Sequence, residues 1–599
     1  MSFPDLRSFL SCLKQDGDLV EVTVPVDRVL EVAEVHRRVV AAGGPALLFS
    51  NVRDADFPLV TNLFGTPRRA ELAFGERPQR LIRRMVELVE TALPPTPATV
   101  WGARDLVAEV FRVGMRRVRR GPVTEVLTED VQLDRLPALT TWPDDGGPFI
   151  TLPMVFTEHP DGRGHNLGMY RMQVHDARTT GMHWQIGKGG GFHYDIAEQR
   201  GAALPVTVFL GGPPALILSA VAPLPENVPE LMLASLIAGE RLGLIDGVGP
   251  HPLVSGSEFA LIGSVSPGVR RPEGPFGDHY GYYSLCHDYP VFSVRQVAHR
   301  RDAIFPATVV GKPRQEDFFI GDLLQELLSP LFPLVMPAVE QLWSYGETGY
   351  HSLSAAVVKQ RYKREAMASA FRILGEGQLS LTKFLLMTDQ PVDLKDFRAT
   401  LEHVLARTRP ETDLYVFSNL SMDTLDYTGP AVNLGSKGVW LGLGDPVREL
   451  PGEFSAAELP QGIRDVQVFC RGCLVVGAPS SSSDPEAPLR VAAHPAFEGW
   501  PLVVVTDEPV RAVKSSMNFL WTTFTRFEPA ADIYAASTQV ARNHLVRTPP
   551  IVIDARRAPS FPAELTCRPD TAATVSERWQ EYFPAGGVEM GDSERGHLD

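Results

Sequence analysis

Two carboxylates flank a short loop in the run Glu273-Gly-Pro-Phe-Gly-Asp278. Pro275 stiffens this loop, and the glycines near it let the backbone turn sharply. A carboxylate beside an arginine favours its charged form, whereas one in an apolar setting has a raised pKa and can hold a transferable proton. If Arg171 lies between the two acids, the loop predicts acid–base chemistry, and a surface loop without function is the alternative.

A second set of polar residues precedes the loop and consists of Asn166, Arg171, His183, His193 and Glu230. An amide oxygen, an imidazole and a carboxylate together suit Mg²⁺ or Mn²⁺ better than a thiol-seeking metal. The spacing fits no short metal motif, so ordinary hydrogen-bonded polar residues are the alternative. His183 stands beside a tryptophan and is interpreted as a packing histidine.

The spacing of Asn166 and Arg171 sets a structural condition. An offset of five residues places them on opposite faces of a regular strand. Both can reach one site if Gly168 introduces a bulge or if the strand begins after Asn166.

Weaker signals come from glycine-rich and cysteine-containing runs. The runs 187–191 and 433–438 combine glycines with Lys188 and Lys437, but neither matches the P-loop or the dinucleotide-binding pattern. Cys470-Arg-Gly-Cys473 is a lone CxxC within an apolar stretch that is typical of a strand, so a metal or redox role is not indicated.

Composition limits the class of protein. The 599 residues carry a net charge of −15, which argues against a nucleic-acid partner because phosphate binding depends on Lys and Arg. Five scattered cysteines fit a reducing compartment. The most apolar window, 205–229, is interrupted by prolines and predicts no membrane span, so we expect a cytoplasmic protein.

The elements expected around these residues fall into three groups. The N-terminal part predicts a small α/β domain with a helix at 5–14, a strand at 19–25, a helix at 29–41 opened by Asp27 and a strand at 45–52. From about 122 to 310, short runs between Gly and Pro predict a barrel or curled sheet, with strands at 149–157, 167–174, 205–210 and 215–220. A helical linker at 318–328 leads to a last α/β part with strands at 379–388, 414–418 and 501–506. No internal repeat is apparent.

Several runs, in order, resemble the UbiD family of carboxy-lyases over about residues 5–550. They are NLGMYRMQVHD, KGGGFHYDIAEQRG, LPVTVFLGGPPALILSAVAPLPENVPE, EGPFGDHYGYYS, VVKQRYKREAMASAF, LTKFLLMTD and NLGSKGVW. The length is most similar to that of the members assigned to menaquinone biosynthesis. The resemblance implies a non-oxidative, reversible decarboxylase that uses prenylated FMN, with Mn²⁺ (or Mg²⁺) and K⁺ anchoring the cofactor phosphate.

The resemblance also assigns residues by motif. The catalytic set falls on Arg171, Glu273 and Asp278, and the divalent-metal ligands fall on Asn166, His193 and Glu230. The expected cofactor-binding residues are Thr151, Asn166, Gly168, Met169, Tyr170, Arg171, His193 and Lys437. Backbone carbonyls around Ser219, Ala220 and Ala222 are expected to hold the monovalent ion.

The fold class implied is α/β, in a multidomain α+β arrangement with a central FMN-binding split β-barrel. The expected segments are an N-terminal α/β domain at 1–120, the barrel at 121–315, a helical linker at 316–345, a C-terminal α/β domain at 346–580 that makes a dimer, and a disordered tail at 581–599.

The expected substrate is an aromatic hydroxy acid, possible forms being a polyprenylated acid or a naphthoate of menaquinone or ubiquinone biosynthesis. Alternatives are a decarboxylase of cinnamate-like unsaturated acids, a carboxylase, a non-catalytic flavin-binding subunit and a metal-dependent hydrolase. Expected partners are a flavin prenyltransferase that supplies the cofactor and a second copy of the chain, in a homodimer or hexamer. No nucleic acid is expected, and the tail of a prenylated substrate would need an apolar channel or an encounter with the membrane surface.

Overall fold

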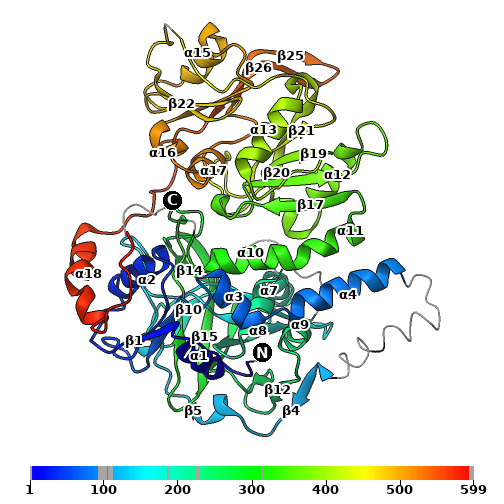
Figure 1. Ribbon diagram of the computed structural model, residues 1–599. Helices are drawn as coiled ribbons and strands as arrows, with labels where there is room; N and C mark the ends of the chain where they lie inside the picture. Colours follow the sequence, from blue (N-terminus) through cyan, green and yellow to red (C-terminus); the bar gives the residue numbers. More distant parts are fainter. Residues whose placement is uncertain are drawn as a thin grey trace. The chain divides into compact units, whose positions relative to one another are not determined.

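The computed structural model describes residues 3–91, 104, 112–184, 189–222, 229–312, 314–456 and 458–592. The chain divides into two compact units (Figure 1). The first comprises Met1–Leu327 and Glu564–His597, and the second comprises Leu328–Ala563. The glycine-rich run at 187–191 lies partly outside the described residues.

The first unit begins with the predicted small α/β arrangement. Helix α1 (Leu6–Gln15) starts at a capping box between Asp5 and Ser8, and its apolar face is buried. Strands β1 (Leu19–Val22), β2 (Ala46–Phe49), β3 (Leu59–Thr61) and β16 (Phe305–Pro306) form one sheet in that order. Helix α2 (Glu31–Ala41) follows Leu30 rather than Asp27. Helices α3 (Pro67–Phe74) and α4 (Arg77–Thr91) follow.

An antiparallel sheet forms the centre of the first unit. Its order is β10-β15-β14-β11-β7-β8, and β5 pairs with β15. The strands are β5 (Val126–Thr128), β7 (Met154–Glu158), β8 (His165–Met169), β10 (Thr179–Gly181), β11 (Leu204–Leu210), β14 (Phe259–Glu273) and β15 (His287–His299). Within the described residues β8 and β10 do not pair, so the sheet is open and the predicted split barrel is not confirmed.

Three helices accompany this sheet: α7 (Gly189–Gln199), α8 (Pro214–Val221) and α9 (Glu230–Ala238). The strand predicted at 215–220 is therefore wrong, because this segment is helix α8. Pro214 occupies the first turn, where a missing N–H costs nothing. The helix is buried on almost every side and so shows no amphipathic period, which makes it look like a buried strand in the sequence.

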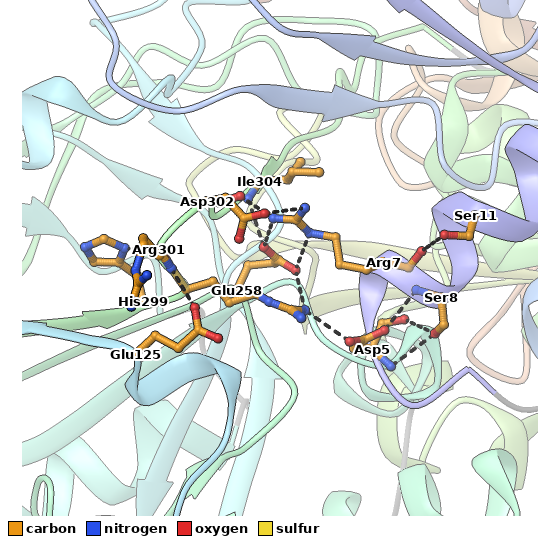
Figure 2. A network of polar contacts seen from close by, with 11 residues as sticks. Asp5, Arg7, Ser8, Ser11, Glu125, Glu258, His299, Arg301, Asp302 and Ile304 are labelled. Carbon is orange, nitrogen blue, oxygen red and sulfur yellow. Dashed lines mark hydrogen bonds and ion pairs between the residues drawn. The ribbon is translucent and has the colours of Figure 1, made fainter.

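A buried carboxylate ties α1 to the start of β14 (Figure 2). Glu258, whose side chain is fully buried, accepts hydrogen bonds from Arg7 Nε and Nη2, each at 3.1 Å. It also accepts from Arg300 Nη1 at 3.3 Å and from the Ile304 N–H at 2.9 Å. Arg300 in turn bonds Asp5, the residue that caps α1. The first helix is thus fixed to the sheet that carries the site.

Helix α18 (Pro569–Tyr582) returns to the first unit and packs against α2. Arg578 and Tyr582 both bond the Glu31 carboxylate. Beyond this helix the Gly591 N–H donates to the Arg38 carbonyl at 3.2 Å. Contacts therefore continue past residue 581, where the predicted tail begins.

The second unit contains two five-stranded sheets. The first has the order β17-β18-β19-β21-β20, with strands β17 (Val339–Ser344), β18 (Leu353–Val358), β19 (Phe384–Thr388), β20 (Leu414–Ser421) and β21 (Leu434–Gly442). The second has the order β22-β23-β24-β26-β25, with strands β22 (Arg464–Cys470), β23 (Cys473–Gly477), β24 (Leu502–Thr506), β25 (Ile533–Ala541) and β26 (His544–Asp554). The main helices are α12 (Glu365–Ile373), α13 (Phe397–Arg407), α15 (Ala487–Ala493) and α17 (Ser516–Phe524).

Two predictions for this unit have different outcomes. Strand β24 is buried along its whole length, as its apolar run predicts. The single strand expected around the CxxC is wrong, because β22 and β23 form a hairpin in which Cys470 pairs with Cys473 across the turn.

One helical stretch among the described residues, Glu316–Val335, is long and apolar enough to cross a membrane by length and composition alone. It comprises α10 (Glu316–Leu328), a 3₁₀ turn and α11 (Phe332–Val335). A single stretch of this kind is weak evidence for a span.

Candidate active site

Arg171 lies between two carboxylates, as the acid–base hypothesis requires. It follows β8 and precedes β9 (Met172–Gln173), while Glu273 is the last residue of β14. Arg171 Nε lies 3.3 Å from Glu273 Oε1, and Nη1 bonds Asp278 Oδ2. The third guanidinium nitrogen donates to Ser284 Oγ at 3.2 Å. The guanidinium stacks on Phe276, 4.6 Å from the ring centroid, so one face is covered by the loop between the acids.

His183 is the second partner of Glu273. Its Nδ1 lies 2.8 Å from Glu273 Oε1, and both side chains are buried. Burial and the neighbouring Arg171 lower the pKa of the His183 imidazole. A carboxylate can only accept, so a neutral His183 must donate through Nδ1. Its interpretation as a packing histidine is therefore incomplete, because it orients a member of the site.

His279 stands on the other carboxylate. Its Nδ1 lies 2.6 Å from Asp278 Oδ1, and its own backbone N–H donates to the same oxygen at 2.7 Å. The Asp278 side chain is 8% exposed, whereas that of His279 is 29% exposed, so the imidazole lies between the buried acid and solvent. Asp317, in the first turn of α10, interacts electrostatically with both residues, and burial raises the pKa of Asp317 to about 6.

Both carboxylates of the catalytic set are ionised in this arrangement. Burial would raise the pKa of Glu273, but His183 and Arg171 hold it below its usual value. Burial would likewise raise the pKa of Asp278, but Arg171 and His279 hold it well below its usual range. The expectation that one acid has a raised pKa is wrong, because the guanidinium contacts both acids rather than one.

The predicted metal ligands come from three elements around β8. Asn166 lies on β8, His193 on α7 and Glu230 at the start of α9, and both helices contact β8. The Asn166 amide faces the first turn of α7, because a Cβ at Gly189 would lie 2.2 Å from its Oδ1. His193 Nδ1 lies 2.8 Å from Thr157 Oγ1, which leaves Nε2 as the nitrogen for a metal ion.

The electrostatics around Glu230 fit a cation. Burial raises the pKa of Glu230 to about 7, and its buried Oε2 has no hydrogen-bond partner among the described residues. His165 Nε2, also buried and unpartnered there, lies 4.0 Å from this oxygen. Burial, with His159 and His165 nearby, lowers the pKa of His193 to about 4, so the imidazole is neutral and able to bind a metal. In the part of the chain that the structure describes, no group of three or more His, Cys, Asp and Glu forms a metal cluster.

The structure meets neither of the two strand conditions set by Asn166 and Arg171. The β7–β8 register is regular from Met154–Met169 to Glu158–His165, so Gly168 introduces no bulge. The strand starts before Asn166 and ends at Met169, two residues before Arg171. A Cβ at Gly168 would lie 2.3 Å from the Tyr170 hydroxyl, so glycine is needed for Tyr170 to fold back and accept from Asn166 Nδ2 at 3.2 Å.

The other predicted cofactor residues have separate surroundings. Thr151 is buried, and its Oγ1 accepts from the Thr308 N–H at 2.9 Å. Lys437 belongs to the second unit, where its buried Nζ donates to the Thr382 carbonyl at 2.9 Å and burial lowers its pKa to about 8. Ser219 lies in the last turn of α8, whose terminal carbonyls have no helical partners.

Sequence reasoning interpreted His183 only as a packing histidine, and it missed three further side chains that contact or face the catalytic set. They are Ser284, His279 and Asp317. His279 follows Asp278 directly in the sequence, which is a usable signal. The others lie on separate elements, and no local spacing identifies them.

Comparison with known proteins agrees with the family resemblance. Three family models match: the N-terminal domain of 3-octaprenyl-4-hydroxybenzoate carboxy-lyase at residues 10–89, its Rift-related domain at 116–313 and its C-terminal domain at 318–442. An uncharacterised protein of Chlamydia caviae is 49% identical over 98% of this chain and 100% of its own length. A protein of Chlamydia pneumoniae that is named as a subunit of 4-hydroxybenzoate decarboxylase is 49% identical over 98% of this chain and 99% of its own.

Solved structures show the same fold. The vanillic acid decarboxylase of Sedimentibacter hydroxybenzoicus in closed form aligns with a TM-score of 0.65 at 23% identity, covering 77% of this chain and 97% of its own. The UbiD-class enzyme HmfF of Pelotomaculum thermopropionicum, in complex with FMN, aligns with a TM-score of 0.61 at 23% identity, covering 76% and 97%.

Proposed function

Because the chain belongs to the UbiD family of carboxy-lyases, we propose that it is a non-oxidative, reversible decarboxylase of an aromatic hydroxy acid that uses prenylated FMN. The observation that carries this proposal is Arg171 held between two buried carboxylates, Glu273 and Asp278. Removing CO₂ from an aromatic ring leaves an electron pair that no side chain can delocalise, and the prenylated flavin, when bound, supplies an acceptor for it.

Arg171 binds and orients the substrate carboxylate, because a guanidinium matches this group with paired hydrogen bonds. Glu273, which is bonded by His183, accepts from Arg171 Nε and so holds the guanidinium in place. An incoming carboxylate adds a third negative charge around one cation, which favours protonation of a resident acid. Asp278, the acid nearer to solvent through His279, takes up this proton and gives it to the ring carbon that loses CO₂.

Proton supply follows from the ionised state of Asp278. After each turnover the acid must be reloaded, and its own side chain is almost inaccessible to water. His279 donates to it at 2.6 Å and reaches solvent, so it delivers the next proton. Asp317 interacts electrostatically with His279 from the first turn of α10.

The cofactor site is formed at α7 and its neighbours. Asn166, His193 and Glu230 would hold Mn²⁺ (or Mg²⁺), which would offset the negative charge of the flavin phosphate. The carbonyls of Ser219, Ala220 and Ala222 would hold K⁺. Thr151, Gly168, Met169 and Tyr170 would contact the flavin.

The substrate class is supported by the name of a relative. The Chlamydia pneumoniae protein is named for 4-hydroxybenzoate. We infer a hydroxybenzoate or naphthoate of quinone biosynthesis, with unsaturated acids as the second candidate. A flavin prenyltransferase supplies the cofactor, and the protein acts in the cytoplasm.

The test is co-expression with a flavin prenyltransferase, followed by a visible spectrum, mass spectrometry of the released cofactor and a CO₂-release screen of aromatic acids. We expect Asp278→Asn to keep the flavin and lose turnover. We expect Glu230→Ala to lose the flavin. The control is Glu158→Ala, at an exposed acid on β7, which should keep both the flavin and turnover. A folded protein without flavin would refute the proposal, and a folded Glu230→Ala with full flavin would refute the metal assignment.

A further inference from the structure

The two sheets of the second unit have one topology. In each, the first two strands are antiparallel, the second to third and third to fifth pairs are parallel, and the fourth returns antiparallel to the fifth. We call residues 339–442 the first copy and residues 464–554 the second copy. The two copies share the strand order 1-2-3-5-4 and the direction of every strand, as repeats of one structural unit do.

The connections agree as well. In each copy a helix links the second and third strands, α12 in the first and α15 in the second. Helices α13 and α17 both follow the third strand. Each begins after an N-cap residue, Asp396 or Ser515, whose side chain accepts from the N–H of the third helical residue.

Equivalent hydrogen bonds recur at equivalent places. After the third strand, Asp389 accepts from the Gly444 N–H and Asp507 accepts from the Arg557 N–H, both at 2.8 Å. Before the fourth strand, Asp413 accepts from the Arg409 N–H at 2.8 Å. In the second copy Asp532 accepts from the Glu528 N–H at 2.7 Å.

The sequence retains traces of the same repeat. Thr388-Asp-Gln-Pro-Val392 corresponds to Thr506-Asp-Glu-Pro-Val510, and Pro410-Glu-Thr-Asp-Leu-Tyr415 corresponds to Pro529-Ala-Ala-Asp-Ile-Tyr534. The prediction that the chain has no internal repeat is therefore wrong. The match to the C-terminal family model ends at residue 442, so it covers the first copy and not the second.

The copies bury equivalent faces against each other. One hydrophobic core combines residues of both copies, whereas the α12 and α15 sides have separate cores. Phe397 of α13 lies 5.9 Å, between ring centroids, from both Phe519 and Phe524 of α17. Contact through the same face on both partners is the arrangement of a two-fold interface.

The polar features of the two copies differ. The first copy buries an ion pair between Lys383 and Asp426 at 2.8 Å, together with Lys437. The strand register places Pro501 and Pro550 where the two lysines stand. The connection that carries Asp426 is reduced in the second copy to a turn at 542–543. The second copy therefore retains the apolar face that packs against the first copy, and it lacks the buried group of Lys383, Asp426 and Lys437.

We propose that the second unit is a tandem duplication in which the second copy covers the helix-bearing face of the first, so that one chain contains internally the two-fold interface that would otherwise join two chains. The face of α13 is then unavailable to another molecule, and any self-association uses other surfaces. This inference is independent of the proposed reaction and of the cofactor.

Hydrogen exchange of the full-length protein tests the proposal. An interface within one chain does not dissociate on dilution, so amide exchange in 397–407 and 516–524 should stay constant from about 50 to about 0.1 µM protein. Sedimentation velocity over the same range reports the mass. Exchange in these helices that rises about tenfold as an oligomer dissociates would overturn the proposal.

A pair of variants tests the coupling between copies. Phe519→Ala removes a buried ring from the shared core and should speed exchange in α13 about tenfold or more, although α13 belongs to the other copy. Val491→Ala removes volume from the separate α15 core and should leave α13 unchanged. An α13 unaffected by Phe519→Ala would contradict a shared interface. The dilution series needs no variant and decides the question if Phe519→Ala does not fold.

Discussion

Replacing His279 with asparagine tests the proton supply to Asp278. The His279 imidazole is 29% exposed, and its Nδ1 lies 2.6 Å from Oδ1 of Asp278, whose side chain is only 8% exposed. Removing the imidazole takes away the titratable group that bonds this carboxylate oxygen. General acid–base groups contribute about 10²- to 10⁴-fold to a rate. Because Asp278 itself remains, we expect the lower end, a fall in kcat of about 100-fold, or about 2.7 kcal/mol in the activation barrier.

The assay is steady-state CO₂ release by the flavin-loaded enzyme, with and without added imidazole. A small imidazole can protonate Asp278 in place of the missing ring, so we expect kcat of the His279→Asn variant to recover with imidazole while KM changes little. His299→Asn, at a histidine that bonds the Arg300 carbonyl, is the control and should retain its rate. Unchanged kcat in His279→Asn, or a loss that imidazole does not restore, would refute the relay.

Three further predictions concern stability and pH. Glu258→Gln puts an amide donor among four N–H donors, so it should lower the free energy of unfolding, measured in urea, by about 3–5 kcal/mol. The control is Asp302→Asn, whose side chain is 77% exposed and which should lower it by about 0–0.5 kcal/mol. Similar losses in the two variants would contradict the role of the network. Burial raises the pKa of Glu316 from 4.5 to about 7. Between these two pH values the native state binds a proton that the unfolded state has released, so the free energy of unfolding falls by about 3 kcal/mol as the pH rises through this window. In Glu316→Gln this part of the pH dependence of unfolding should vanish, and its persistence would assign it to another group. His183→Asn removes a partner that lowers the pKa of Glu273, so the acid limb of the kcat/KM profile should move to higher pH, and an unmoved limb would exclude the contact from catalysis.

Local patterns in the sequence determined much of the fold. Apolar spacing identified α1 and its buried face, and the continuous apolar run identified β24. The same kind of run failed at α8, because a helix buried on almost every side has no period to distinguish it from a buried strand. The family runs identified Arg171, Glu273 and Asp278 as one set, since residue types and their order are properties of the sequence alone.

The tertiary structure decided what those residues contact. Arg171 and Glu273 are 102 residues apart, and the fold brings them together with His183. Because the guanidinium reaches both acids, their pKa values fall together, which residue types could not show. The repeat was hidden for a related reason. Main-chain hydrogen bonds and apolar burial preserve a topology while most side chains change, so the ten paired strands display a duplication that few identical residues record.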